Sequence, residues 1–177
     1  MHFKVVLPVL AALPSIFAQT TTPPTYKLRA DLKPGQPGRP DKTAYDGLYL
    51  SSYHTGAGLN DAVFYSKDPA DGIVGSLNGT FPWSMLMALN TATYAAWEPV
   101  RIDAGEGGIS ARGWGNGFFI NDTGLQWSSS TSEETNSFAG WMVCDWHSEV
   151  QLFFRLKYYN PTTPASCADV YLCPEYQ

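Results

Sequence analysis

The chain has 177 residues and a formal net charge of −5, and its charged residues make up 15% of the total, below the usual quarter. It lacks the basic surplus that marks proteins binding nucleic acid or anionic lipid, so we expect neither as a partner. The length suits one domain with a full core.

Residues 1–18 have the pattern of a secretory signal peptide. A short start carries Lys4, an apolar run follows from Val5 to Leu13, and small residues precede Gln19. The apolar run is too short to cross a bilayer. We therefore predict a secreted, extracellular protein without a membrane partner, in a compartment where disulfides and N-glycans form.

Residues 19–25 are rich in Thr and Pro and are predicted to be a tether, because they have no apolar residues to bury. Residues 26–177 are predicted to form a single β domain. Apolar and polar residues alternate with period two in its clearest segments, as in half-buried strands. The expected strands are 26–33, 47–53, 62–65, 100–103, 117–121, 141–146, 151–158 and 168–172.

Gly, Pro, Asn or Asp separates nearly every pair of these segments, at spacings typical of sandwiches and barrels. The segment 83–94 is compatible with either a helix or a strand. We predict an all-β, single-domain antiparallel β-sandwich or barrel. A β-trefoil is the alternative, because aromatic blocks begin at Gly47, Gly117 and Gly140, although their uneven spacing argues against a repeat.

Three cysteines remain after the signal peptide: Cys144, Cys167 and Cys173. In an oxidising compartment one bridge and one leftover thiol are expected, and we favour Cys144–Cys167. Cys173 could instead compete for Cys144 or pair between chains. Cys and His are not clustered at ligand spacing, so we predict no metal site and no cofactor.

Two sequons predict N-glycosylation at Asn78 and Asn121. Each is followed closely by a glycine, as a hairpin turn on the surface would require.

The block 53–61 offers the first candidate chemistry. His54 and Asp61 could form an acid/base pair, but the same residues suit a wide hairpin in which the glycines adopt positive φ and the Asn and Asp bond their own backbone. We favour the hairpin. His147 lies beside Asp145 and is a further candidate base. The chain has no Gly-x-Ser-x-Gly elbow and no His-Glu-x-x-His, which removes two common hydrolase signatures.

The six tryptophans suggest a sugar-binding alternative, since a flat aromatic ring matches the apolar face of a pyranose. Trp141 and Trp146 are expected in the core because Val143 and Cys144 separate them, whereas Trp114 and Trp127 stand among Gly, Asn and Ser and are the better surface candidates. Burial of all the tryptophans is the commoner outcome in a β-fold.

The blocks 53–64, 97–100 and 140–146 resemble an uncharacterised family of small secreted ascomycete proteins. The segment 166–172 is also faintly similar to the C-terminal domain of fungal cell-wall mannoproteins, without its four-cysteine pattern. These resemblances imply a fungal secretory context and transfer no catalytic residue. We therefore expect a non-catalytic protein that associates with cell-wall polysaccharide or a host extracellular protein. The alternative is an extracellular hydrolase or lyase that uses His54, Asp61 or His147.

Overall fold

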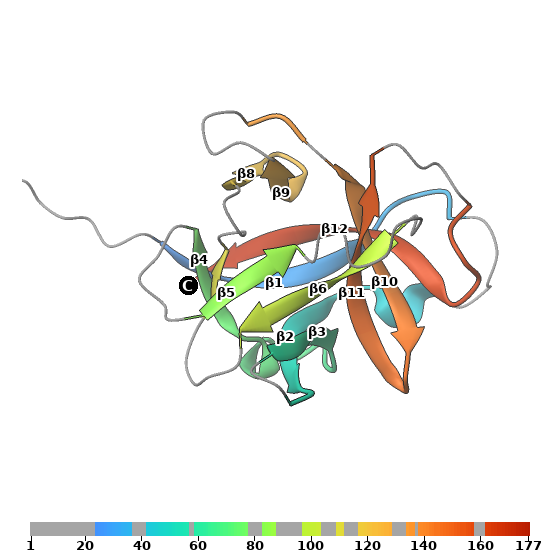
Figure 1. Ribbon diagram of the computed structural model, residues 1–177, viewed down its shortest axis with the longest axis horizontal. Coiled ribbons are helices and arrows are strands. Elements are labelled where there is room, and N and C mark those ends of the chain that lie inside the picture. The colour runs from blue at the N-terminus through green and yellow to red at the C-terminus, as the bar shows by residue number, and fades with distance from the viewer. Residues whose placement is uncertain are drawn as a thin grey trace, which may run out of the picture.

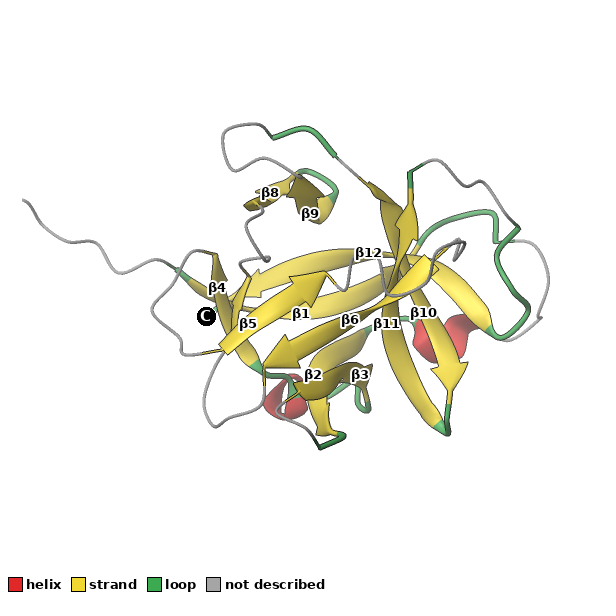
Figure 2. Cartoon of the chain, viewed as in Figure 1, coloured by secondary structure: helices red, strands yellow, loops and turns green. Residues whose placement is uncertain are grey.

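A computed structural model of the chain describes residues 24–36, 42–56, 59–77, 83–87, 97–103, 109–111, 117–128, 134–136, 138–157 and 162–177. The predicted signal peptide, Asn78 and Trp114 lie outside these residues. The fold is all-β, as predicted (Figures 1 and 2). Its strands are β1 (Thr25–Leu32), β2 (Leu48–His54), β3 (Leu59–Phe64), β4 (Val74–Leu77), β5 (Trp83–Met87), β6 (Trp97–Asp103), β7 (Ile109–Ala111), β8 (Gly117–Asn121), β9 (Gly124–Ser128), β10 (Phe138–Trp146), β11 (Glu149–Leu156) and β12 (Cys167–Tyr176).

Among the described residues, the 3-10 helix η1 (Lys42–Tyr45) lies between β1 and β2, and the 3-10 helix η2 (Pro69–Asp71) lies between β3 and β4. The described residues contain no helix long and apolar enough to cross a membrane.

Six strands close into a ring. β10 pairs with β12, β12 with β1, β1 with β2, β2 with β3, β3 with β11, and β11 with β10 again. Each of these pairs is antiparallel. A sheet that returns to its first strand is a barrel, so the barrel form of the prediction is the one observed. Figure 1 shows β10 and β11 crossing steeply over the end of β1 and β12.

The β-trefoil alternative does not fit this ring. A three-fold repeat would draw equivalent strands from each third of the chain, whereas the ring uses the first three strands and the last three. Strands from the middle of the chain extend the same sheet beyond β11, in the order β6, β5, β7 and β4. Its β4–β7 and β5–β7 pairs are parallel, while the other pairs of the large sheet are antiparallel, as predicted.

Strand alternation places the core inside the ring. In β1 the side chains of Tyr26, Leu28 and Ala30 are buried, while those between them are half-exposed. Leu152 and Phe154 of β11 and Trp141 of β10 complete the same cluster from the opposite wall. The inward residues therefore follow the period-two pattern that the sequence showed.

The β8–β9 hairpin is a separate two-stranded sheet that packs on β12 and β10. Figure 1 shows it beside β12, away from the ring strands β2 and β3. Its five β9 residues are all buried, and the indole N–H of Trp141 donates to the Leu125 carbonyl at 2.6 Å. The hairpin thus closes one side of the core.

Candidate functional site

Three large aromatic side chains stand in solvent on the outer surface of the ring. They are Tyr53 of β2, Tyr65 just after β3, and Trp146 at the end of β10, with exposures of 48%, 47% and 51%. We call them the outer aromatic face. Tyr176, at the end of β12, is the other large exposed aromatic among the described residues.

Strand alternation explains why Trp146 is outside. Trp141 and Trp146 are an odd number of residues apart, so β10 sends them to opposite faces. Trp141 is buried in the core, and Trp146 packs edge-on against Phe153 of β11, with ring centroids 6.0 Å apart. Sequence reasoning placed both rings in the core, which is correct for Trp141 and wrong for Trp146.

Tyr65 lies between Trp146 and Tyr53 in the strand order of the ring, β10–β11–β3–β2. Glu149 of β11 is the register partner of Trp146. Burial, with help from the charge of Glu149 and from Tyr53, raises the pKa of the Tyr65 hydroxyl to about 12. The hydroxyl therefore remains a neutral donor at ordinary pH. Because Trp146 and Tyr65 stand two strand spacings apart, about 10 Å, they offer two separate stacking positions.

Polar groups border the outer aromatic face. Asp61 lies opposite Tyr53 in the β2–β3 register and forms an ion pair with Arg101 of β6.

Beneath the face, the outward residues Val63 and Gln151 are register partners and are almost completely buried. Outward residues of a sheet are hidden only when neighbouring side chains cover them, so the surface between the exposed rings is packed rather than open.

The three candidate catalytic residues do not converge. His54 pairs with Asn60 through Nδ1 and Oδ1 at 2.9 Å, while Asp61 points to the other face of β3, toward Arg101. His147 lies in the two-residue turn between β10 and β11, next to the opposite end of β3, and its ring meets Trp146 edge-on. Geometry therefore gives no acid/base pair from these residues.

The 53–61 block is a hairpin, as favoured, since Tyr53 and His54 of β2 pair with Asp61 and Asn60 of β3, while Gly58 lies outside the described residues. Gly56 has the positive φ that a turn requires. Asn60 and Asp61, which were expected to bond their own backbone, belong to β3 and use their side chains across the sheet.

Trp127 is not a surface residue, so its predicted role as an exposed sugar platform is wrong. It is 3% exposed and packs edge-on against Phe138, with ring centroids 6.3 Å apart. Its Gly and Ser neighbours suggested a loop, but they belong to a strand whose two faces are both covered.

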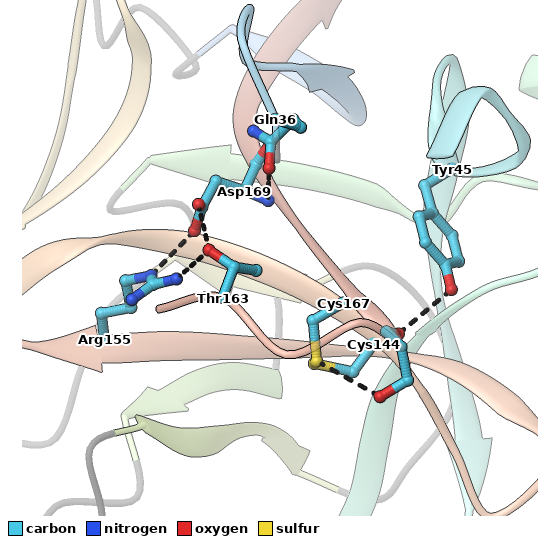
Figure 3. The surroundings of a disulfide bond; sticks show 8 residues. Gln36, Tyr45, Cys144, Arg155, Thr163, Cys167 and Asp169 are labelled. Carbon is cyan, nitrogen blue, oxygen red and sulfur yellow. Dashed lines mark hydrogen bonds and ion pairs between the residues drawn. A yellow bond between two sulfur atoms is a disulfide. The ribbon is translucent and has the colours of Figure 1, made fainter. Parts of the chain in front are cut away.

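The Cys144–Cys167 disulfide is present, as predicted. The two cysteines are register partners in β10 and β12, on the outer side of the ring beside Phe153. Figure 3 shows the surrounding polar contacts: Asp169 accepts from Arg155 Nε at 2.8 Å and from the Thr163 hydroxyl at 2.6 Å, and Tyr45 donates to the Ser166 carbonyl. These bonds hold the last strand in place and leave the outer aromatic face uninvolved.

Cys173 is a free, partly buried thiol. Burial, and then its hydrogen bond to Asp31, raise the pKa of Cys173 to about 11. Only the thiolate is strongly nucleophilic, so this thiol is held in its unreactive form.

A polar cavity of about 590 Å³ opens near Cys173, lined in part by Arg29, Asp31, Tyr49 and Lys67. Arg29 donates to Asp31 at 2.7 Å and also binds Glu175, which accepts from the Tyr49 hydroxyl. The hydrogen bonds from Arg29 lower the pKa of Asp31. The carboxylate is thereby kept ionised, which suits an ion-pair network better than a proton donor.

Asn121 is exposed in the β8–β9 turn, where its side-chain oxygen accepts from the backbone and hydroxyl of Thr123 at 2.9 and 2.7 Å. The hairpin turn expected for this sequon is present. Glycosylation of Asn121, like that of Asn78, stays a prediction.

The family model of the Domain of unknown function (DUF7907) matches residues 23–176. The chain belongs to this family. No curated protein and no solved structure matches the chain. The family has no assigned activity, so the function has to be argued from the site.

Proposed function

We propose that this protein is a secreted, non-catalytic binder of cell-wall polysaccharide, and that the outer aromatic face is its binding surface. The observation that carries the proposal is that Tyr53, Tyr65 and Trp146 are each about half exposed and stand on the outer surface of neighbouring ring strands. Exposed apolar surface on a small protein commonly marks an interaction site.

A sugar suits this surface for chemical reasons. The apolar face of a pyranose stacks on an aromatic ring, and its hydroxyls need donors and acceptors beside that ring. Here the Tyr65 hydroxyl, the Glu149 carboxylate and the Asp61–Arg101 pair lie next to the rings. The strand scaffold fixes the rings in advance, so little conformational entropy is lost on binding.

The test is retention of purified mature protein on insoluble fungal and plant polysaccharides. Trp146→Ala is expected to weaken binding by about 1–3 kcal/mol, or roughly 5- to 150-fold in Kd, on the scale known for bases stacked on aromatic rings. Tyr65→Ala should act in the same direction. Both variants should keep the wild-type melting temperature within a few degrees, because an exposed ring contributes little to the core.

Tyr176→Ala is the matched control, since Tyr176 is an equally exposed aromatic outside the outer aromatic face. It should leave retention unchanged. Equal losses in Trp146→Ala and Tyr176→Ala would show nonspecific adhesion and sink the proposal. Retention on no polysaccharide, combined with Trp146-dependent capture of a host extracellular protein, would assign the face to a protein partner instead.

The alternative of an extracellular hydrolase or lyase has its own test. A broad substrate panel should show no turnover. Turnover that disappears in His54→Ala or His147→Ala would establish the enzyme, despite the separation of those residues in the fold.

A further inference from the structure

A second cavity lies where the start of β1 and the end of β12 meet the β8–β9 hairpin. Its volume is about 350 Å³, and its wall includes Tyr26, Leu77, Phe119, Ile120, Glu134 and Tyr176. The wall is mainly apolar, and the volume lies in the range of small-molecule sites. The cavity shares no residue with the outer aromatic face.

Tyr26 makes this cavity unusual. The side chain is 1% exposed, and its hydroxyl finds no hydrogen-bond partner within the described residues. A buried hydroxyl without a partner is unfavourable and rare in folded proteins. Burial, with a smaller effect of Tyr176, raises the pKa of Tyr26, so the group stays a neutral phenol. It is therefore a buried hydrogen-bond donor without a partner among the described residues, on a side chain that lines the cavity.

Tyr176 lies beside Tyr26 on the neighbouring strand. The two residues are register partners, and their rings meet edge-on with centroids 6.0 Å apart. Because the Tyr26 hydroxyl is sealed from water, a ligand must displace a neighbouring side chain to reach it. Tyr176 is 58% exposed, so its ring has solvent into which it can turn.

We propose that this cavity binds a small, uncharged, largely apolar molecule that carries a carbonyl oxygen, and that Tyr26 donates its hydroxyl hydrogen to that oxygen. The apolar wall from Leu77, Phe119 and Ile120 accepts the hydrocarbon part. Glu134 lies at the edge of the cavity and disfavours an anion such as a fatty-acid carboxylate. A ketone or an ester satisfies the buried donor without adding charge.

The experiment compares undecan-2-one with undecane, which has the same chain length and no acceptor. Each is titrated against the mature protein loaded with the neutral fluorophore N-phenyl-1-naphthylamine, and displacement gives Kd. The ketone is expected to bind more tightly than the alkane. Tyr26→Phe should weaken ketone binding roughly 2- to 12-fold, the usual worth of one neutral hydrogen bond, and leave alkane binding unchanged.

Stability supplies an independent readout. Tyr26→Phe should keep or raise the melting temperature, because it removes a hydroxyl that has no partner. Tyr45→Phe is the control: its buried hydroxyl donates to the Ser166 carbonyl at 3.1 Å, so the variant should lose stability while keeping wild-type ketone affinity. Ile120→Trp should fill the cavity and reduce binding of both compounds.

Three results would overturn the proposal. They are displacement by neither compound, equal wild-type affinity for ketone and alkane, or undiminished ketone binding in Tyr26→Phe. A lower melting temperature in Tyr26→Phe would also count against it, because it would show that the hydroxyl already has a stabilising partner.

Discussion

Trp127 and Trp146 show what the surroundings of a residue in sequence can and cannot reveal. Trp127 was expected outside because Gly and Ser flank it, and Trp146 inside because it follows Val143 and Cys144. Both positions are reversed. The face on which a side chain lies depends on strand parity and on what packs against that face. Parity alone would have separated Trp146 from Trp141, whereas the cover over Trp127 comes from strands distant in sequence.

Gly124 offers a test of close packing between the β8–β9 hairpin and β12. A Cβ at Gly124, which has φ +92°, would lie 2.2 Å from the Leu172 carbonyl oxygen. Gly124→Ala should therefore lower the free energy of unfolding by about 2 kcal/mol or more, through both backbone strain and steric overlap. Urea denaturation measures this loss in the free energy of unfolding.

Gly56 is the matched control for that variant. It has nearly the same φ, +90°, but no atom lies within 4 Å of a Cβ built there. Gly56→Ala should cost only the backbone strain, about 1–2 kcal/mol. Equal losses in the two variants would show that the hairpin does not pack tightly against β12.

Asp31 predicts an acid-dependent loss of stability. Hydrogen bonds from Arg29 lower its folded-state pKa below the unfolded value of about 4. A carboxylate with a lowered folded pKa stabilises the fold above that unfolded pKa, and the contribution is lost as the pH falls through the folded pKa. The free energy of unfolding should therefore decrease below about pH 4.

Arg29→Met should make this decrease smaller, because the folded pKa of Asp31 then returns toward its unfolded value. Lys27→Met, which removes a neighbouring cation on the same strand, should leave the acid slope as it is in the wild type. Urea denaturation at a series of pH values gives the acid slope of the wild type and of both variants. An unchanged slope in Arg29→Met would contradict the assigned cause.

At the level of elements, strands with clear alternation were predictable and short ones were not. Four of the predicted segments, 26–33, 47–53, 117–121 and 151–158, coincide closely with strands, and the other four each overlap part of a strand. β4, β7 and β9 were not predicted. β9 alternates Leu125 and Trp127 with Gln126 and Ser128, but Gly and Ser suggested a loop there, and β7 has three residues, too few for a period to show. The ambiguous segment 83–94 contains strand β5 in its described part.

The β10–β11 hairpin turn predicts a stabilising substitution. His147 and Ser148 form a two-residue turn with φ of +51° and +70°, the geometry that favours Asn-Gly. Ser148→Gly should raise the free energy of unfolding by up to about 1 kcal/mol, because glycine removes the left-handed strain. The larger entropy that glycine loses on folding offsets part of this gain. Ser148→Ala keeps the strain and should bring no gain. A loss in Ser148→Gly, seen by thermal denaturation, would show that the serine side chain stabilises the turn.

At the level of the whole molecule, the arrangement of the strands could not be predicted. The ring closes through pairs between the two ends of the domain, β1 with β12 and β3 with β11. Such pairings depend on long-range packing that local patterns do not encode. The outer aromatic face has this origin in part: Tyr53 and Tyr65 belong to the β2–β3 hairpin, whereas the long-range β3–β11 pair brings Trp146 to their side of the ring. The disulfide was predictable, because few cysteines leave few pairings.

That disulfide is expected to be the strongest single tie in the closed ring. It joins β10 to β12 across a separation of 23 residues, for which the chain-entropy model gives about 3 kcal/mol. The double variant Cys144→Ala/Cys167→Ala should lose about 2–5 kcal/mol of unfolding free energy, the usual range for small secreted domains. Removing both cysteines prevents a new bridge to Cys173. Cys173→Ala is the control and should change stability by less than about 1–2 kcal/mol, since that partly buried thiol is unbridged. If the double variant were as stable as the control, the hydrogen-bonded strands and the Arg155–Asp169 contact would hold β12 in the ring without covalent help.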